Sequence, residues 1–214
     1  AQVHPGDVYR EGISRLSNRD FRYARELGYA IKLLAIAKEE NKEVEVRVHP
    51  VFIAEDSLLA KVDGVYNAVL VEGDLVGKVL FFGEGAGALP TSSAVVADVI
   101  AAARDVALGV SSRAGFSLEP GKVIKPMAEI ESRYYLRLNV ADRPGVLAQV
   151  SRVLGDKLIS ISSVIQQLAD GVAQTAEIVI MTHPAGEAAM QSALGELAEL
   201  PVIKEISSFI RVEA

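Results

Sequence analysis

Apolar residues recur with the spacing of one helix face in residues 20–40, DFRYARELGYAIKLLAIAKEE. The apolar stripe contains Ala24, Leu27, Ile31 and Leu34, whereas Arg25, Lys32 and Lys38 lie off it. Asp20 stands where a helix N-cap is expected, and Gly28 would be a mid-helix glycine that permits close packing against another backbone. The pattern therefore predicts a single helix over residues 20–40.

A period-two alternation follows in residues 44–53, VEVRVHPVFI, and predicts a half-buried strand. The two faces of this strand would carry Val44, Val46 and Val48 on one side, and Glu45, Arg47 and His49 on the other. We expect the valine face to be buried and Pro50 to mark an edge or a bulge. His49 is expected at the surface or in an interface.

Two more elements are predicted before residue 110. Residues 64–83 hold two β-rich runs around Glu72-Gly73-Asp74, which is typical of a hairpin. An Ala-rich helical pattern covers residues 91–109. This helix is expected to begin after Pro90, with Thr91 or Ser92 as its cap, and to end at Gly109.

Residues 110–132 lose this periodicity and are the best linker candidate in the chain. Beyond them the order is βαββαβ, at residues 134–140, 142–156, 158–167, 173–182, 186–200 and 202–212, with a turn at Asp170-Gly171. Two βαβ-like halves predict a ferredoxin-like sandwich with helices on one face of an antiparallel sheet. The other face must be covered, so we expect self-association through it or through the edge strands.

Composition narrows the function classes. The 214 residues contain no Cys and only three His, far apart, so we expect no disulfides, no cysteine catalysis and no metal site. The net charge is −6 without a basic block, which argues against a nucleic-acid partner. Short apolar stretches and a start without a secretion signal predict a cytoplasmic protein with no membrane partner. The chain begins Ala-Gln-Val-His, so we expect a processed product or a piece of a longer protein.

The segment FFGEGAGALPTSSAV fits the dinucleotide pattern GxGxxG/A at Gly83, Gly85 and Ala88, between a strand and a helix. Against a complete dinucleotide fold, Pro90 would separate the glycines from the helix, and the preceding strands look hairpin-linked. Two alternatives remain open. The segment is either a structural glycine turn, or bare backbone at Gly85–Gly87 approaches a ligand held mainly by other residues.

The segment from Asp142 to Leu147, DRPGVL, lies between a strand and a helix. Gly145 and the first amide groups of the helix would suit a carboxylate. The alternative is an ordinary turn that Asp142 caps. The carboxylate pairs Glu55/Asp56, Asp98/Asp105 and Glu187/Glu196 are interpreted as solvated faces, and no complete set of catalytic residues is visible.

Several motifs together resemble homoserine dehydrogenase: VYREGI (8–13), ELGYAIKLLAIA (26–37), VHP (48–50), NAV (67–69), EGD (72–74) and GEGAGALPTSSAVVADV (83–99). Ser92 departs from the Ala expected after Thr91. The resemblance implies an NAD(P)-dependent enzyme that interconverts aspartate semialdehyde and L-homoserine in threonine, methionine and isoleucine biosynthesis. It also implies that Gly85, Ala86 and Gly87 face the nicotinamide-ribose end of the cofactor. In the family the Rossmann domain, substrate carboxylates and catalytic lysines precede VYREGI, so we expect this chain alone to be inactive and not to bind NAD(P).

Residues 134–214, with DRPGVLAQV, resemble an ACT regulatory domain. The resemblance implies an amino-acid effector, L-threonine, held at Asn139, Asp142, Gly145, Val146, Ile161 and Ser162, commonly between two paired copies. The predicted fold class is thus α+β: an antiparallel or mixed-sheet dimerisation domain with packed helices (1–112), a linker (113–132) and a ferredoxin-like ACT domain (133–214). Two other readings remain open: a stand-alone amino-acid sensor whose first domain is a dimerisation scaffold, and an interaction module without a ligand.

Overall fold

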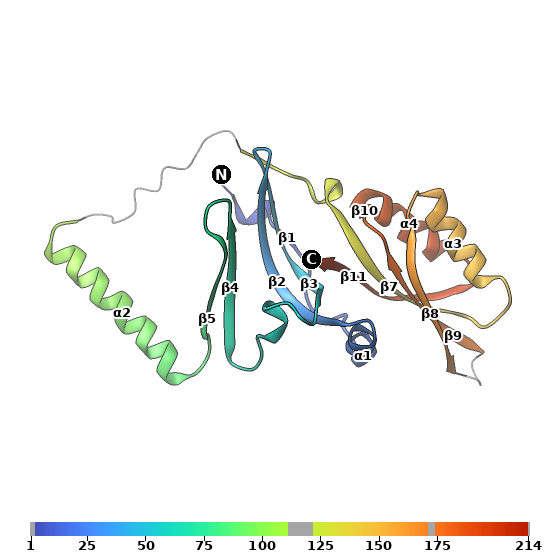
Figure 1. Ribbon diagram of the computed structural model, residues 1–214, viewed down its shortest axis with the longest axis horizontal. Coiled ribbons are helices and arrows are strands. Elements are labelled where there is room, and N and C mark those ends of the chain that lie inside the picture. The colour runs from blue at the N-terminus through green and yellow to red at the C-terminus, as the bar shows by residue number, and fades with distance from the viewer. Residues whose placement is uncertain (1–2, 111–121, 171–173, 214) are drawn as a thin grey trace. The chain divides into compact units, whose positions relative to one another are not determined.

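The computed structural model describes residues 3–110, 122–170 and 174–213. The chain divides into two compact units, one formed by residues 1–55 with 120–214 and the other by residues 56–119 (Figure 1). Part of the predicted linker and Gly171 of the predicted turn lie outside the described residues. The elements of the first unit are β1 (Tyr9–Arg10), α1 (Asn18–Glu26), β2 (Tyr29–Glu40), β3 (Glu43–Ala54), β6 (Val123–Ile124), β7 (Glu131–Ala141), α3 (Val146–Asp156), β8 (Ile161–Asp170), β9 (Thr175–Thr182), β10 (Ala185–Gly186), α4 (Glu187–Glu199) and β11 (Ile203–Glu213).

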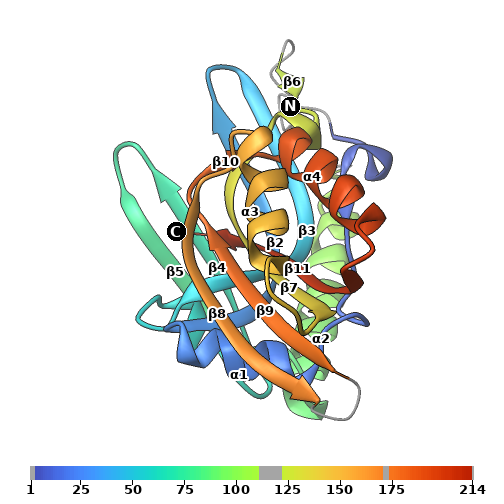
Figure 2. The ribbon, with the colours of Figure 1, turned by 90° about the vertical axis from the view of Figure 1, so that its right-hand side faces the viewer.

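The predicted βαββαβ order is confirmed. Four antiparallel strands run in the order β11-β7-β9-β8, and Figure 2 shows α3 and α4 together on one face of them. Every second side chain along these strands faces the helices. Leu136, Leu138 and Val140 of β7 thus share one core with Val150 of α3 and Leu197 of α4. The fold class is α+β with a ferredoxin-like sheet, as the pattern predicted.

This sheet does not end at β11, because β3 joins it. Arg211 to Glu213 of β11 pair in parallel with Val51 to Ile53 of β3, and β2 covers the opposite edge of β3 along its whole length. Short strands β6 and β1 precede β11 along the same edge of β3. The first part of the chain and the βαββαβ part therefore share one nine-stranded sheet.

The single helix predicted over residues 20–40 is wrong. Helix α1 ends at Glu26, Gly28 has a φ of +80°, and residues 29–40 form β2. Gly28 thus ends the helix, since this left-handed conformation carries little penalty only for glycine. The run that follows is stabilised by twelve antiparallel partners in β3, a tertiary context that outweighs its helical spacing.

Helix α1 covers part of the sheet face that lies opposite α3 and α4. Tyr23 and Ala24 of α1 are buried there against Phe52 of β3, Tyr135 of β7 and Val179 of β9. A segment of the same chain, rather than the self-association predicted from the sequence, therefore covers this part of the face.

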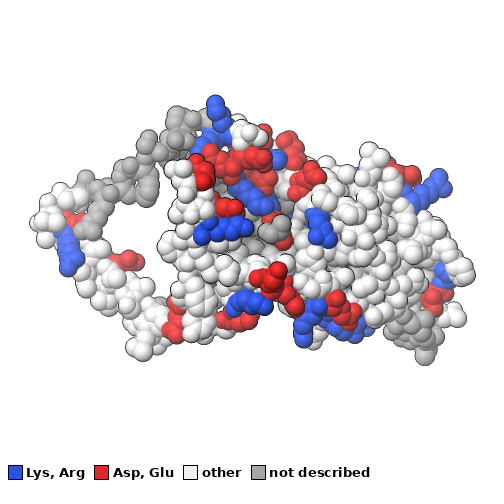
Figure 3. Space-filling view, viewed as in Figure 1, with Lys and Arg blue, Asp and Glu red and all other residues white. Residues whose placement is uncertain are grey.

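The expected burial of β3 is also wrong in part. Arg47 and His49 are buried, whereas Val46 and Val48 are only half-buried. Arg47 reaches the surrounding carboxylates Glu45 and Glu213, so its charge is paired inside the protein. Burial lowers the pKa of His49, although its Nδ1 lies 3.0 Å from the carbonyl oxygen of Pro50. Figure 3 shows the acidic and basic side chains intermixed over the β2–β3 hairpin.

Pro50 sits inside β3 at the place where β1 ends and β11 begins. The amide of Glu11 donates to the carbonyl of Val48, and the next pair on this edge is Arg211 with Val51. By strand alternation the N–H that Pro50 lacks would point toward this break between two neighbours. The proline therefore removes no ladder hydrogen bond.

The second unit contains the predicted hairpin, β4 (Tyr66–Gly73) and β5 (Gly77–Glu84), and helix α2 (Ala88–Ala107). The helix begins earlier than predicted, directly after Gly87, whose φ is +122°. Pro90 is the third residue of the helix and does not precede it. A proline is tolerated there because the N–H groups of the first helical turn have no acceptor within the helix. The glycines therefore adjoin the helix N-terminus after all. Among the described helices, none is long and apolar enough to cross a membrane.

Gly28 provides a test that separates the two structures for residues 20–40. In a continuous helix Gly28→Ala would stabilise the chain by about 1 kcal/mol. At a φ of +80° the same substitution should instead lower the free energy of unfolding by about 1 kcal/mol, with no clash involved. Urea unfolding measures this difference. Gly12→Ala, at a glycine outside the left-handed region, is the matched control and should change stability little.

Candidate functional site

The turn after β7 presents backbone groups at the start of α3 that have no partner among the described residues. Gly145 is the N-cap of α3 with a φ of +85°, and no described side chain caps the helix. Asp142 is exposed, and its backbone amide donates to the carbonyl of Gln174. The alternative in which Asp142 caps the helix is therefore wrong. The first amide groups of α3 point their partial positive charge out of the turn, which suits a small anion.

The other predicted effector residues do not all gather at this turn in one chain. Asn139 lies on β7 between Leu138 and Val140, which face α3 and α4, so its side chain projects from the opposite face. Its Oδ1 is buried and has no hydrogen-bond partner among the described residues. Ile161 and Ser162 begin the edge strand β8, which β9 separates from β7.

In the glycine turn of the second unit, close packing explains why residue 85 is a glycine. A Cβ atom on Gly85 would lie 1.9 Å from the side-chain nitrogen of Asn67, and the Gly85 amide donates to the carbonyl of Val65 at 2.9 Å. Gly85 is thus required by its close approach to Asn67. Gly87 and the uncapped start of α2 at Ala88 remain as bare backbone that another group can approach.

A buried ion-pair network joins α1 to the sheet. The Arg137 side chain donates to Asp20 Oδ1 at 2.8 Å and to Glu177 Oε2 at 2.9 Å, and Tyr23 donates to Glu177 Oε1 at 2.7 Å. Burial alone would raise the pKa of Asp20, but hydrogen bonds from Arg137 and Ser17 lower it. Burial is likewise outweighed at Glu177, whose pKa the bonds from Tyr23 and Arg137 lower. Both carboxylates are therefore charged and satisfied inside the protein.

A second network lies on the other face of the sheet, around Arg211. This guanidinium donates to Glu187 at 2.9 and 2.5 Å and to Glu11 at 3.1 Å, and it stacks 4.9 Å from the Tyr9 ring centre. Glu187 is the first residue of α4 and is 2% exposed, so interpreting it as part of a solvated face is wrong. Tyr134 also donates to Glu187, and burial raises the pKa of this tyrosine. The network fixes the segment after β1 against the start of α4.

Comparison with known proteins agrees with both parts of this architecture. Residues 1–100 match the family described as homoserine dehydrogenase, and residues 134–202 match the ACT domain. The chain is therefore similar to homoserine dehydrogenases in its first part and to ACT domains in its second. Asp20 and Glu11 lie in the first match, whereas Arg137, Glu177 and Glu187 lie in the second. Both buried networks therefore connect the homoserine dehydrogenase part with the ACT part.

Individual homoserine dehydrogenases align over nearly the whole chain. The enzyme of Neisseria gonorrhoeae is 46% identical over 213 residues, which cover 96% of this chain and 48% of that protein. The enzyme of Helicobacter pylori is 41% identical, over 97% of this chain and 48% of that protein. The crystal structure of a homoserine dehydrogenase from Thiobacillus denitrificans matches with a TM-score of 0.81 at 41% identity, over 97% of this chain and 48% of that one. The chain thus spans about half the length of these relatives.

The two arginines at the network centres were not among the candidate residues predicted from the sequence. A signal for them exists, because Arg137 interrupts the apolar run YYLRLNV and Arg211 interrupts FIRV. An arginine in a strand that is otherwise buried requires a paired carboxylate. The sequence does not say which carboxylate pairs with it, since Asp20 lies 117 residues from Arg137.

Asp20 tests the first network. Asp20→Asn should lower the free energy of unfolding at pH 7 by about 3 kcal/mol, because it removes one partner of a buried charge. The folded-state pKa of Asp20 is lowered, so the stabilisation is present above the ordinary carboxyl pKa and is lost as the pH falls through the folded-state value. The difference between wild type and variant should therefore shrink below about pH 4.

Urea unfolding at pH 7, 5 and 3.5 checks this prediction. Asp156→Asn is the control, because its pair with Arg152 is exposed and spans 3.8 Å. A loss at pH 7 no larger than that of the control would show that the network does not stabilise the fold.

Proposed function

We propose that this chain provides dimerisation and feedback regulation to a homoserine dehydrogenase, and that its ACT domain binds L-threonine. The uncapped start of α3 behind Gly145 carries this proposal. The amides of Gly145 and Val146 hold the effector carboxylate at the positive end of the helix. Asp142, exposed at the same turn, is placed to accept the ammonium group or the hydroxyl.

The ACT site is completed by a second copy in this proposal. Ile161 and Ser162 lie on β8, the edge strand at the far end of the sheet order, so they are placed to face the turn of a paired domain. Asn139 stays a prediction, because its side chain projects from the opposite face. Regulation requires that the effector bind one arrangement of the enzyme better than another, since equal affinity for both shifts nothing.

The whole enzyme would interconvert aspartate semialdehyde and L-homoserine with NAD(P), in threonine, methionine and isoleucine biosynthesis. The turn at Gly85, Ala86 and Gly87 fits a limited part in this reaction, because the backbone before the uncapped α2 can approach a polar group of the cofactor. In the family the segments that precede VYREGI would supply the hydride-transfer site and the lysine that transfers the proton. We therefore infer that residues 1–214 alone are inactive and do not bind the cofactor.

We assign residues 1–112 to the dimerisation part, 113–132 to the linker and 133–214 to the regulatory domain. The β4–β5 hairpin supports self-association. Val69 and Phe81 are cross-strand partners and are 60% and 62% exposed, and two strands alone do not bury their apolar side chains. We infer that a second copy covers this hairpin in a homodimer or larger homo-oligomer. A stand-alone amino-acid sensor would share these features but needs no match to the enzyme family over residues 1–100.

Effector binding is tested by calorimetric titration with L-threonine, with L-isoleucine and L-lysine as comparison ligands. We expect L-threonine to bind more tightly than either comparison ligand, and Gly145→Val to remove this tight binding, because a side chain there blocks the amides and strains a φ of +85°. Gly64→Val imposes similar strain at a φ of +65° in the other unit and should leave binding unchanged. If Gly145→Val binds L-threonine like the wild type, the effector site lies elsewhere.

Self-association is tested by sedimentation velocity at micromolar concentration. We expect a dimer or a larger species, and Phe81→Asp should shift it toward the monomer because it places a charge within the apolar contact. Lys78→Ala on the same hairpin is the control, since Lys78 is exposed and its pair with Glu72 spans 3.7 Å. A wild-type monomer would contradict the proposed contact.

A further inference from the structure

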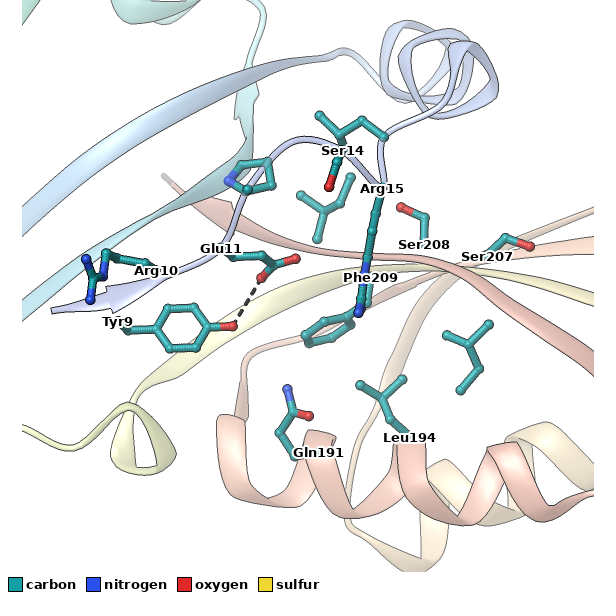
Figure 4. Close-up of a pocket in the computed structure, with 15 residues that line it drawn as sticks. Tyr9, Arg10, Glu11, Ser14, Arg15, Gln191, Leu194, Ser207, Ser208 and Phe209 are labelled. Carbon is teal, nitrogen blue, oxygen red and sulfur yellow. Dashed lines mark hydrogen bonds between the residues drawn. The ribbon is translucent and has the colours of Figure 1, made fainter. Parts of the chain in front are cut away.

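A cavity of about 600 Å³ lies where the sheet divides (Figure 4). Strand β3 pairs with β1 up to Val48 and with β11 only from Val51, so β11 diverges from β3 before Arg211. Between Ile203 and Ile210 the outer edge of β11 pairs with no described strand. The segment after β1 forms one wall, and α4 with β11 forms the other. Small-molecule sites have volumes of roughly 300–1,000 Å³, so this cavity is large enough to hold one.

One side of the cavity carries hydrogen-bond acceptors. Both the Tyr9 hydroxyl and Arg211 Nη1 donate to Oε2 of Glu11, at 3.1 Å in each case. These bonds leave Oε1, which Figure 4 shows pointing toward the interior of the cavity. Gln191 uses its Nε2 to donate to Glu187 at 2.8 Å, so its amide oxygen remains for another donor. This side can hold an ammonium group.

The opposite side carries donors without partners. Arg15 lines the cavity and forms no ion pair or hydrogen bond with any described residue, Glu11 included. In Figure 4 its side chain extends from the loop toward β11, whereas that of Arg10 points away from the cavity centre. The hydroxyls of Ser14 and Ser208 also line the wall and have no partner among the described residues. A guanidinium flanked by hydroxyls binds a carboxylate well.

We propose that this cavity binds a free α-amino acid. Its carboxylate lies at Arg15, Ser14 and Ser208, its ammonium group at Glu11 Oε1 and Gln191, and its side chain against Leu194 and Phe209. The cavity holds an unpaired cation and a carboxylate oxygen too far apart to pair with each other, and a zwitterion satisfies both at once. The site is separate from the Gly145 turn and does not rest on the proposed regulatory function.

Occupancy of the cavity would bridge the two matched parts of the chain. Glu11 and Arg15 belong to the homoserine dehydrogenase match, and Gln191 belongs to the ACT match. A bound zwitterion adds charged contacts across this boundary, next to the Arg211 network. It therefore stabilises the docked arrangement of the two parts by linkage.

The test is a calorimetric titration of the chain carrying Gly145→Val, which removes the turn site from the measurement. The probes are glycine, L-serine, L-threonine, L-valine and L-leucine. We expect at least one to bind, and its N-acetyl and amide derivatives, which lack one charge each, to bind at least tenfold more weakly. Arg15→Gln should weaken binding about tenfold or more, as expected for a lost hydrogen bond to a charged group. Arg152→Gln, at an exposed arginine on α3, should not weaken it.

Gln191→Leu tests the acceptor side on an exposed helix position and should also weaken binding. If Gly145→Val prevents folding, the same titrations of the wild-type chain must show a site that Arg15→Gln removes and Arg152→Gln retains. The proposal is overturned if none of the five amino acids binds at millimolar concentration, or if Arg15→Gln leaves the affinity unchanged. Neither result depends on the outcome of the Gly145 experiment with L-threonine in the wild-type chain.

Discussion

Buried arginine pairing on both faces of one sheet holds the architecture of this chain together. The strand contact between β3 and β11 is only three residues long, too short to fix two parts of a protein by itself. On one face Arg137 binds Asp20 of α1, and on the other Arg211 binds Glu11 beyond β1. Each arginine also binds a carboxylate of the ACT part, Glu177 or Glu187. Each arginine therefore joins two carboxylates, one from each part, and Asp20 and Glu11 lose these ion pairs when the parts separate.

This arrangement makes separation of the two parts costly. Moving ions out of water carries a desolvation penalty of several kcal/mol per ion, which is offset only while the partners stay in place. If α1 left the sheet, Arg137 would keep Glu177 but lose Asp20, and the Phe52–Tyr135 stacking at 4.5 Å would be exposed. The apolar contact and the ion pairs thus open together. A change on the ACT sheet therefore reaches α1 without a flexible intermediate.

The sequence predicts the elements of this chain better than their partners. Beyond residue 133 the pattern predicts the βαββαβ order of the described elements correctly, apart from the two-residue β10, because each main strand and helix there has a clear period and short turns. Residues 29–40 were placed wrongly, because Ile31 and Leu34 fit a helical spacing while the deciding information, pairing with β3, is non-local. Gly28 is the one local signal of the helix end, but a glycine at this position fits both a helix that ends there and one that continues past it. The burial of Arg47 and His49 is also not predicted, because it too depends on non-local partners. One carboxylate that pairs with Arg47 lies 166 residues away.

The same limit applies to the candidate sites. The Gly145 turn can be found from sequence because a helix N-terminus and its glycine are neighbours in the chain. The cavity beside Glu11 and Arg15 cannot, because its other wall comes from α4 and β11, almost 200 residues later. The two places differ in what they can control. In the proposed scheme a ligand at the turn would act on the pairing of ACT domains, whereas a ligand in the cavity would act on the boundary that Arg211 already fixes. Of these two positions the cavity is the one lined by both matched parts of one chain, so a ligand bound there would act on their docking without requiring a second copy.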